Sequence, residues 1–339
     1  MTKVITIGLD LGKNVFQVHG VDASGAAVLR RRLRRGEVLR FFAKLEPATV
    51  GIEACATAHH WGRALAALGH TVRLMPARYV KAYVKRQKND ASDAAAICEA
   101  VTRPTMHFVP VKTMEQQAAL MLHRARDLLI RQRTMLVNAL RGHLAEFGLV
   151  RARGAKALGE LVALIGSADV PAEAQAALRP LVSQLEASEA QIAALDGVIR
   201  EWHQSNDVSC RLATVPGIGP LTASAIAASV PDAGAFANAR QFAAWLGLVP
   251  RQNTTGGKPR LGGISKQGNA YIRRLLIIGA QSVLRWARPT RPTPWLLALL
   301  ARRPRKVAAV ALANKMARIA WALLARGERY RHQILPAAA

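Results

Sequence analysis

The chain has 339 residues, of which 51% are hydrophobic, so two or three domains with buried cores are expected. A net charge of +27 points to a polyanionic partner such as nucleic acid, although a merely soluble basic surface is the alternative. Three widely separated cysteines without a CxxC pair argue against a zinc site or a disulfide framework, and favour a reduced cytoplasmic setting.

The charge is concentrated at the two ends of the chain. Residues 1–150 contain 23 Lys and Arg against 11 Asp and Glu, residues 151–209 contain 5 against 8, and residues 210–339 contain 20 against 2. Both ends are therefore candidates for contact with DNA or RNA, and the middle is a candidate spacer.

Short apolar, β-branched runs alternate with helical patterns in the first hundred residues. Three strand-like runs come first, and helices and strands alternate after them, which favours an α/β sandwich around a mixed sheet. The expected strands are residues 4–9, 15–21, 27–33, 49–52 and 71–75, and the expected helices are residues 37–45 and 61–68.

Two long helical patterns occupy the middle of the chain. The first covers residues 112–147, and the second repeats apolar side chains from Leu178 to Trp202 at spacings of three and four, with Ser188 as its one polar member. Such a heptad seam predicts a coiled-coil arm that dimerises or spans the basic ends, although an ordinary helix pair within one domain is the alternative. Pro180 is expected to mark the start of this helix or a kink.

A compact, basic and mostly helical domain is expected from Arg211 onward. The apolar stretch Val307–Ala325 carries internal polar and basic residues, so it is typical of a basic amphipathic helix and not of a membrane span. The tail Gln333–Ala339 is expected to be frayed. The predicted domains are residues 1–110, 111–209 and 210–330 of a cytoplasmic, nucleoid-associated protein.

Four carboxylates stand at the ends of strands or the start of a helix in the first domain. Asp10 and Glu53 each end a strand-like run, whereas Asp90 and Asp93 share one face of a first helical turn. Taken singly they have structural explanations, because Asp often follows a strand and also caps helices. Together they would repel one another unless a cation lay between them, and hard oxygen ligands suit Mg²⁺ or Mn²⁺. Such ions can hold the attacking and leaving oxygens of a phosphodiester, which makes this cluster a candidate for DNA cleavage.

The run Gly8–Lys13 also resembles the opening of actin-like sugar kinases and ATPases, which bind nucleotide with Mg²⁺. No further glycine-rich phosphate loop stands in the expected places. A kinase also has no use for so large a positive charge, so this class is disfavoured.

Residues 215–223, Val-Pro-Gly-Ile-Gly-Pro-Leu-Thr-Ala, match the helix-hairpin-helix pattern. Gly217 and Gly219 allow a tight turn, after which backbone N–H groups at the start of a helix can face a phosphate. This contact carries no sequence information. A tight turn between helices without DNA is the alternative.

A polar, glycine-rich loop at residues 247–260 can surround a phosphate with hydroxyls and cations. One hydroxyl is a candidate nucleophile if a base or metal activates it, and a flexible loop that touches only the DNA backbone is the alternative. The candidate nucleic-acid-binding cations in and after the loop are Arg251, Lys258, Arg260, Lys266, Arg273 and Arg274.

As a set, these segments resemble the DEDD transposases of the IS110 group of insertion sequences, including its IS1111 branch. The matching segments occur in the expected order over nearly the whole chain: IGLDLGK, GIEA, KNDASDA, VPGIGPLTA, FAAWLGLVPRQ and ISKQGNAYIRRLL. The resemblance implies an RNase-H/RuvC-like first domain with Asp10, Glu53, Asp90 and Asp93 as metal ligands. It also implies a coiled-coil arm and a C-terminal transposase domain whose serine forms a covalent link to DNA.

The same resemblance implies an active site that is shared between the subunits of a homo-oligomer, a dimer or a tetramer. Its nucleic-acid partners would be the element ends, the target DNA and a structured guide RNA from the element's non-coding end. No membrane partner is implied.

The chain departs from the family pattern at the nucleophile. The family serine falls just before the glycine of the loop, where this chain has Thr255, preceded by Thr254. Threonine carries the same hydroxyl, with a methyl group that stiffens χ1. Thr255 is the first candidate, Thr254 replaces it if the alignment shifts by one residue, and Ser265 is more distant. An inactive copy is a further alternative.

Three classes of function are therefore carried forward. The first is a transposase or site-specific recombinase, and the second is a RuvC-like junction-resolving nuclease that uses water in place of a protein hydroxyl. The third is a non-enzymatic, basic DNA-binding protein built on the glycine hairpin.

Overall fold

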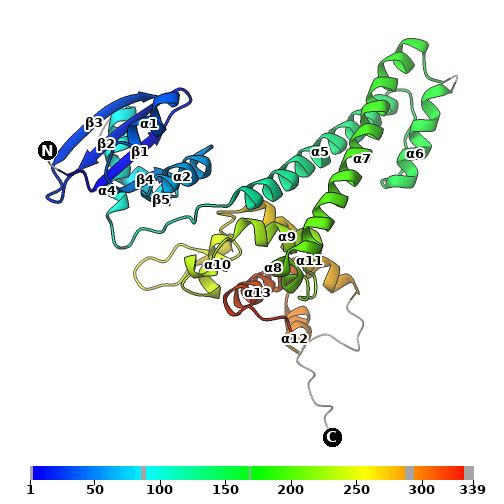
Figure 1. Ribbon diagram of the computed structural model, residues 1–339. Helices are drawn as coiled ribbons and strands as arrows, with labels where there is room; N and C mark the ends of the chain where they lie inside the picture. The colour runs from blue at the N-terminus through cyan, green and yellow to red at the C-terminus, as the bar shows by residue number, and fades with distance from the viewer. Residues whose placement is uncertain (1–2, 85–88, 168, 287–293, 332–339) are drawn as a thin grey trace, which may run out of the picture. The chain divides into compact units, whose positions relative to one another are not determined.

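The computed structural model describes residues 3–84, 89–167, 169–286 and 294–331 (Figure 1). The expected frayed tail lies outside these residues. The chain forms two compact units. The first joins Met1–Met114 with Val230–Asn238, and the second joins Glu115–Ser229 with Ala239–Ala339.

The first unit is built on a five-stranded mixed sheet with the strand order β3-β2-β1-β4-β5. Neighbours among the first three strands are antiparallel, whereas β4 runs parallel to both β1 and β5. The strands are β1 (Thr6–Leu11), β2 (Val15–Val21), β3 (Ala27–Arg34), β4 (Thr49–Glu53) and β5 (Thr71–Met75). The mixed α/β sheet expected from the sequence is therefore confirmed.

One face of this sheet packs against α1 (Val38–Phe42) and α2 (Ala58–Ala67). Because alternate side chains of a strand point to opposite faces, Phe16 and Val18 of β2 are buried while their neighbours are half-buried. Trp61 of α2 meets the Phe16 ring edge-on, at 5.0 Å between ring centroids.

The other face is covered by α4 (Asp90–Val101), which follows α3 (Ala77–Val80) and the short helix η2 (Lys81–Tyr83). Buried residues of α4, including Ile97 and Val101, pack with Met75 at the end of β5. The sheet is thus enclosed between two helical layers, as a three-layer α/β arrangement.

The second unit begins with a long helical hairpin of α5 (Met114–Ala145) and α7 (Ala172–Ser205) (Figure 1). The shorter α6 (Ala155–Ala163) and η3 (Leu164–Gly166) lie between them in the chain and close an apolar cluster with both. These lengths confirm a helical region after the sheet, but Pro180 does not begin the second helix. The helix starts eight residues earlier at Ala172, and Pro180 lies inside it.

The seam residues of α7 show why this helix is stable with one polar member. Leu178, Leu185, Ile192 and Ile199 are buried, and so is Ser188. The Ser188 hydroxyl donates a 2.7 Å hydrogen bond to the Gln184 carbonyl of its own helix, which removes the cost of burying it.

Shorter helices complete the second unit. They are α8 (Asp207–Leu212), α9 (Pro220–Ser229), α10 (Ala239–Trp245), α11 (Ala270–Trp286), α12 (Pro294–Arg302) and α13 (Arg305–Arg326). By length and composition alone α13 could cross a membrane. However, its alanines at 309, 313, 317 and 320 are almost completely buried, and it packs against α10 and α11. One face of α13 therefore packs within the unit, as the sequence prediction of an amphipathic helix requires.

Candidate active site

Asp10 and Glu53 occupy neighbouring strands at the same level of the sheet. The parallel pairing of β1 with β4 sets Leu9 opposite Ile52, so the next residue on each strand is a carboxylate. Leu9 and Ile52 are buried in the core against α1 and α2. Asp10 and Glu53 therefore belong to the opposite face, which carries α4.

Gly8 allows α4 to approach this face closely. A methyl group at Gly8 would collide with the backbone of Ala94 and with the amide of Cys98, and would lie 2.8 Å from the Cys98 Cβ. Asp10 lies two residues beyond Gly8 on the same face, and Asp90 lies one helical turn before Ala94. The missing side chain thus brings the first turn of α4 beside the end of β1.

The N-terminus of α4 is capped by Asn89, so the capping role that the sequence left open for Asp90 is filled by another residue. The Asn89 side chain accepts a 2.8 Å hydrogen bond from the Ser92 amide. Asp90 and Asp93 share the first turn of this helix.

The negative charges of the other three carboxylates act on Asp10. The pKa of Asp10 is raised from 3.8 to about 6, first by desolvation and then by the negative charges of Asp93, Asp90 and Glu53. Among the described residues, no three His, Cys, Asp or Glu side chains are gathered tightly enough for a ready-made metal site. Neighbouring negative charges disfavour the ionised form of a carboxyl group, which accounts for their part in the raised pKa. An all-carboxylate donor set fits a hard divalent cation such as Mg²⁺ or Mn²⁺.

Replacing Gly8 with alanine is expected to lower the free energy of unfolding by about 1–3 kcal/mol and to impair DNA cleavage, because the new methyl group meets backbone that cannot rotate away. Thermal unfolding and a cleavage assay would measure both effects. Gly36→Ala is the matched control, since nothing lies within 4 Å of a methyl group there. Equal behaviour of the two variants would contradict the close approach of α4.

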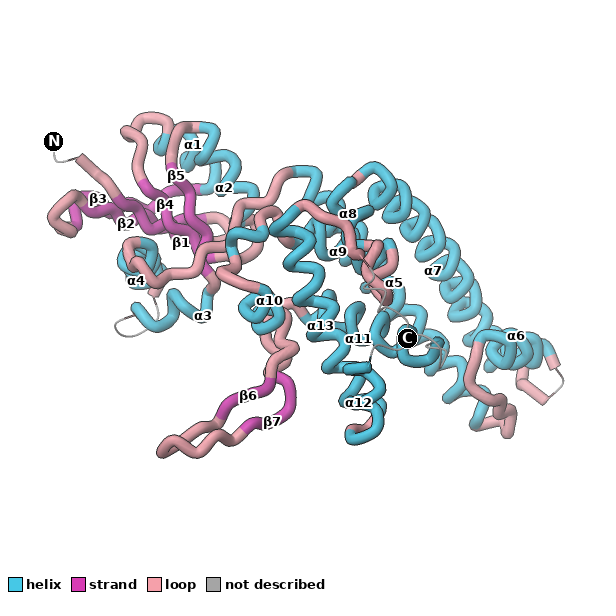
Figure 2. The backbone as a smooth tube through the Cα atoms, turned by 90° about the horizontal axis from the view of Figure 1, so that it is seen from below, coloured by secondary structure: helices cyan, strands magenta, loops and turns pink. Residues whose placement is uncertain are grey.

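The second candidate group lies on a ribbon of β6 (Pro250–Gln252) and β7 (Leu261–Ile264), which projects from the helices of its unit (Figure 2). Thr255 and Lys258 pair across its tip, with a 3.1 Å hydrogen bond from the Lys258 amide to the Thr255 carbonyl. Gly256 and Gly257 form the turn between them with φ of +57° and +75°. Two positive φ values are typical of a type I′ hairpin turn, for which a Gly-Gly pair is well suited.

The three cations of this ribbon are available to a ligand. Arg251, Lys258 and Arg260 are exposed, and no acidic side chain of the described residues pairs with them. The Thr255 hydroxyl is therefore presented at the tip of a narrow, positively charged hairpin.

Two of the three cations that follow the ribbon have protein partners for their side chains. Arg273 donates hydrogen bonds to the carbonyls of Leu246 and Gln267, at 2.9 and 2.7 Å. Arg274 forms an ion pair with Asp127. Lys266 has φ of +57° in the preceding loop. The structure thus gives Arg273 and Arg274 roles in folding, and their contact with nucleic acid stays a prediction.

The glycine hairpin before α9 has one tightly packed and one open glycine. Gly217 has φ of +87°, and a methyl group there would lie 2.8 Å from the Met316 Cε and 2.9 Å from the Gly279 carbonyl oxygen. Gly219 has open space around it and accepts the first hydrogen bonds of α9, from the amides of Thr222 and Ala223. Gly217 therefore serves packing against α11, and Gly219 leaves the start of α9 accessible.

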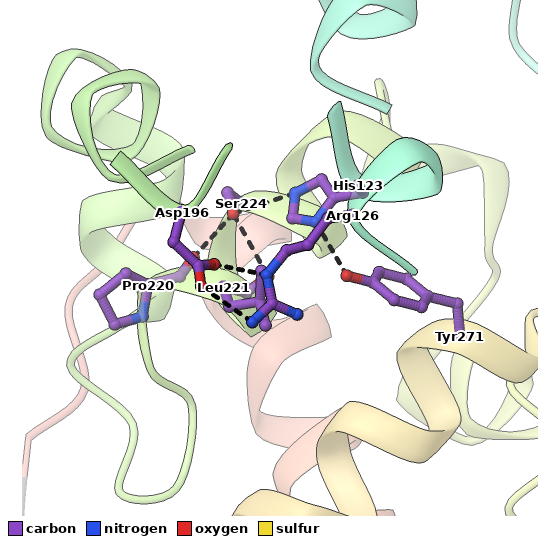
Figure 3. A network of polar contacts seen from close by, with 7 residues as sticks. All are labelled: His123, Arg126, Asp196, Pro220, Leu221, Ser224 and Tyr271. Carbon is purple, nitrogen blue, oxygen red and sulfur yellow. Dashed lines mark hydrogen bonds and ion pairs between the residues drawn. The ribbon is translucent and has the colours of Figure 1, made fainter. Parts of the chain in front are cut away.

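A buried polar network connects the helical hairpin with α9 and α11 (Figure 3). His123 of α5 lies 3.1 Å from both the Tyr271 hydroxyl and the Ser224 hydroxyl, and Ser224 donates a 2.7 Å bond to the Pro220 carbonyl. Burial lowers the pKa of His123 to about 4, so the ring is neutral at pH 7. With Ser224 donating to Pro220, the ring donates from Nε2 and accepts the Tyr271 proton at Nδ1. Beside it, Arg126 pairs with Asp196 of α7.

Sequence reasoning missed this network, and no local signal could have found it. Its partners Ser224 and Tyr271 lie 101 and 148 positions from His123 in the chain. The close approach at Gly8, in contrast, had a signal, because a glycine inside an apolar strand marks a point where another backbone comes near.

Two family models match the chain. Residues 7–148 match a family of transposases whose name combines DEDD and IS110. Residues 209–295 match the transposase family IS116/IS110/IS902. The first match contains all four carboxylates, and the second contains the glycine hairpin and the ribbon.

Curated relatives match over almost their whole length. A probable family 20 transposase of Pseudomonas aeruginosa is 52% identical over 96% of this chain and 98% of its own. The transposase for insertion sequence element IS1111A of Coxiella burnetii is 40% identical over 98% of this chain and 92% of its own. The transposase for element IS1328 of Yersinia enterocolitica is 39% identical over 96% and 98%.

Proposed function

Because the chain belongs to the IS116/IS110/IS902 family of insertion-sequence transposases, we propose that it moves an insertion sequence with carboxylates of the first unit and a hydroxyl of the second. A transposase cuts and rejoins DNA, so DNA is its partner and the chain is an enzyme. The family expected from the sequence motifs is thus confirmed. The groups proposed to do the chemistry are supported mainly by the parallel register of β1 and β4, which brings Asp10 and Glu53 to the same level of the sheet. The negative charges of Asp93, Asp90 and Glu53 also act on Asp10.

The first unit is proposed to be an RNase-H/RuvC-like catalytic domain. Its strand order, with an antiparallel β1–β3 ribbon beside parallel β4 and β5, supports this assignment. Membership in a DEDD transposase family implies a divalent metal in general, and we propose Mg²⁺ or Mn²⁺ held by Asp10, Glu53, Asp90 and Asp93. Such an ion, when bound, would stabilise the negative charge that develops on a phosphate under attack.

Thr255 is proposed as the nucleophile of the second unit. Its hydroxyl oxygen would bond to the phosphorus of a DNA phosphodiester as its proton is taken up by a base. One bridging oxygen would leave as a free DNA end. Arg251, Lys258 and Arg260 would stabilise the charge on the phosphate. Attack by another DNA hydroxyl on the phosphothreonine would then join DNA and restore Thr255.

The remaining features are proposed on the family resemblance and the structure together. The long pair α5 and α7 would act as a coiled-coil arm in a dimer or tetramer, and residues 1–110, 111–209 and 210–330 would be its functional domains. The open start of α9 after Gly219 would contact a DNA phosphate, as in a helix-hairpin-helix. A structured guide RNA would be a second nucleic-acid partner, and the enzyme would act in the cytoplasm, in association with the nucleoid.

Wild-type protein is expected to form a covalent adduct with DNA in the presence of Mg²⁺. The substrate would be a labelled duplex that spans the DNA flanking the gene, with RNA transcribed from the adjacent non-coding stretch. An adduct would survive detergent and disappear after protease treatment, and EDTA would prevent it.

Two other results would redirect the assignment. Cleavage that requires Mg²⁺ but leaves no adduct would favour a junction-resolving nuclease that uses water. Tight binding without any cleavage would indicate an inactive or purely DNA-binding copy.

A further inference from the structure

The carboxylate face of the sheet continues beyond Asp10 to its arginine-rich edge. Asp10 of β1 pairs with Gln17 of β2, and Gln17 pairs with Arg32 of β3. Residues that pair directly across strands share a face, so Asp10, Gln17 and Arg32 form one lateral row with Glu53 at its other end. With neighbouring strands about 4.8 Å apart, the Arg32 backbone lies roughly 10 Å from that of Asp10.

A parallel row lies one step further along the same face. Gly8 pairs with His19, and His19 pairs with Arg30. Here α4 covers Gly8, whereas Arg30 on the edge strand is exposed. A cavity of about 350 Å³ lies between these strands and the start of α4, and Gln17, His19, Arg30 and Arg31 contribute to its wall. The face therefore has a hollow that leads from the edge strand to the first turn of α4.

The positive charge of this edge is not neutralised within the protein. β3 contains Arg30, Arg31, Arg32 and Arg34 and no acidic residue. In the described part of the chain, no acidic side chain pairs with Arg30, Arg31 or Arg32. Like charges so close together repel one another, and a polyanion would relieve that repulsion.

Strand alternation separates these arginines into two sets. Arg31 lies between Leu29 and Leu33, on the side of the core that packs against α1. Arg30 and Arg32 lie on the side of Asp10 and α4. This second pair therefore shares its side of the sheet with the carboxylates.

We propose that Arg30 and Arg32 form a binding site for the phosphate backbone of the DNA strand being cut, so that the strand crosses the sheet from the edge to Asp10. The proposal rests on the proposed function for the identity of the strand, but its binding step does not depend on cleavage. Guanidinium groups bind phosphates by paired hydrogen bonds, and such contacts position a strand without reading its sequence. A phosphate bound at the edge would thus hold the next part of the backbone near the carboxylates.

Positive charge on an edge strand has another known use, because it discourages pairing with the edge of a second molecule. That use would be served by arginines of either face. The two explanations therefore differ in whether the loss of Arg30 and Arg32 weakens DNA binding or causes self-association.

The test compares two double variants of the full-length protein with equal loss of charge. Arg30→Ala with Arg32→Ala removes the proposed site, whereas Arg40→Ala with Lys44→Ala removes two exposed cations in and just after α1. The probe is a fluorescein-labelled, 30-base-pair DNA duplex of arbitrary sequence, titrated without divalent metal over a series of NaCl concentrations. The first variant is expected to bind more weakly, with a log–log salt slope shallower by about 1–2, since each lost phosphate contact removes about 0.9. The control is expected to keep the wild-type slope.

Three outcomes would overturn the proposal. One is an equal change in both variants, which would show a general effect of charge. The second is unchanged binding with oligomers on gel filtration, which would assign the arginines to edge protection. The third is unchanged binding without any other effect. Arg30→Lys with Arg32→Lys, which keeps the charge, is expected to recover most of the binding and to show that the sheet still folds.

A cleavage assay distinguishes the loss of this binding site from the loss of the carboxylates. Removal of Arg30 and Arg32 is expected to raise KM for DNA and leave kcat nearly unchanged at saturating DNA. If wild-type protein shows no cleavage, the proposed function fails, while the binding comparison still decides the role of the edge.

Discussion

Replacing Asp10 with asparagine is expected to lower the rate of strand cleavage in Mg²⁺ by more than about 100-fold and leave DNA binding nearly intact. The expected size follows from metal sites in general, where loss of even an outer partner of a ligand costs about 10–100-fold. DNA binding persists because the change removes a metal ligand and no phosphate contact. Single-turnover cleavage and fluorescence anisotropy with the same duplex would measure the two effects.

The same variant should unfold at a higher temperature than the wild type in EDTA at pH 8. The pKa of Asp10 is about 6 in the folded protein against an ordinary 3.8. Protonated Asp10 therefore contributes its full stabilisation of the folded protein below pH 3.8, and this contribution is lost as the pH rises through about 6. Asparagine stays neutral and avoids that loss, whereas Mg²⁺ should stabilise only the wild type.

Glu46→Gln is the matched control for this stability measurement. Glu46 is an exposed carboxylate of the same unit, and its pKa is lowered by Lys3. Its replacement should leave cleavage unchanged and should not stabilise the protein at pH 8. If Asp10→Asn retained cleavage, the metal site would have to be placed elsewhere.

Replacing Thr255 with alanine is expected to remove both the covalent adduct and recombination, because it deletes the hydroxyl at the tip of the β6–β7 hairpin. Thr255→Ser should keep or increase activity, since serine offers the same hydroxyl without the methyl group that restricts its rotation. Adduct trapping and a recombination assay on the same substrates would measure this.

Thr254→Ala is the natural control for the nucleophile, since an adjacent residue in an extended ribbon points to the other face. It should retain the adduct. Loss of activity in this variant alone would shift the nucleophile by one residue. If neither threonine mattered while Asp10 did, water or Ser265 would be the attacking group.

The sheet and its carboxylates could be predicted because both depend on local patterns. The residues of β2 alternate between buried and half-buried, as expected for a strand with one face on a core. Asp10 and Glu53 each come directly after an apolar run. Because β1 and β4 are parallel neighbours in one sheet, the strand ends that carry Asp10 and Glu53 lie side by side. The influence of Glu53, Asp90 and Asp93 on the pKa of Asp10 agrees with that expectation, while their role as ligands stays a prediction.

Other features depend on contacts between distant segments and could not be predicted. Arg273 reads as a free cation in the sequence, but its guanidinium binds backbone carbonyls of the preceding loop. Pro180 was expected to mark a helix start or a kink, and it does not start the helix: α7 extends through it, because packing against α5 and α6 outweighs the local cost of proline. His123 gave no signal for its two buried hydroxyl partners.

The tight contact at Gly8 also affects how the copies of such an element in a genome should be judged. Copies that no longer move accumulate changes freely, and an intact set of motif carboxylates is an obvious sign of a functional copy. A copy with any side chain at position 8 would keep that set and still hold the first turn of α4 away from Asp10. This glycine therefore belongs with the four acids in any count of copies that are still able to move.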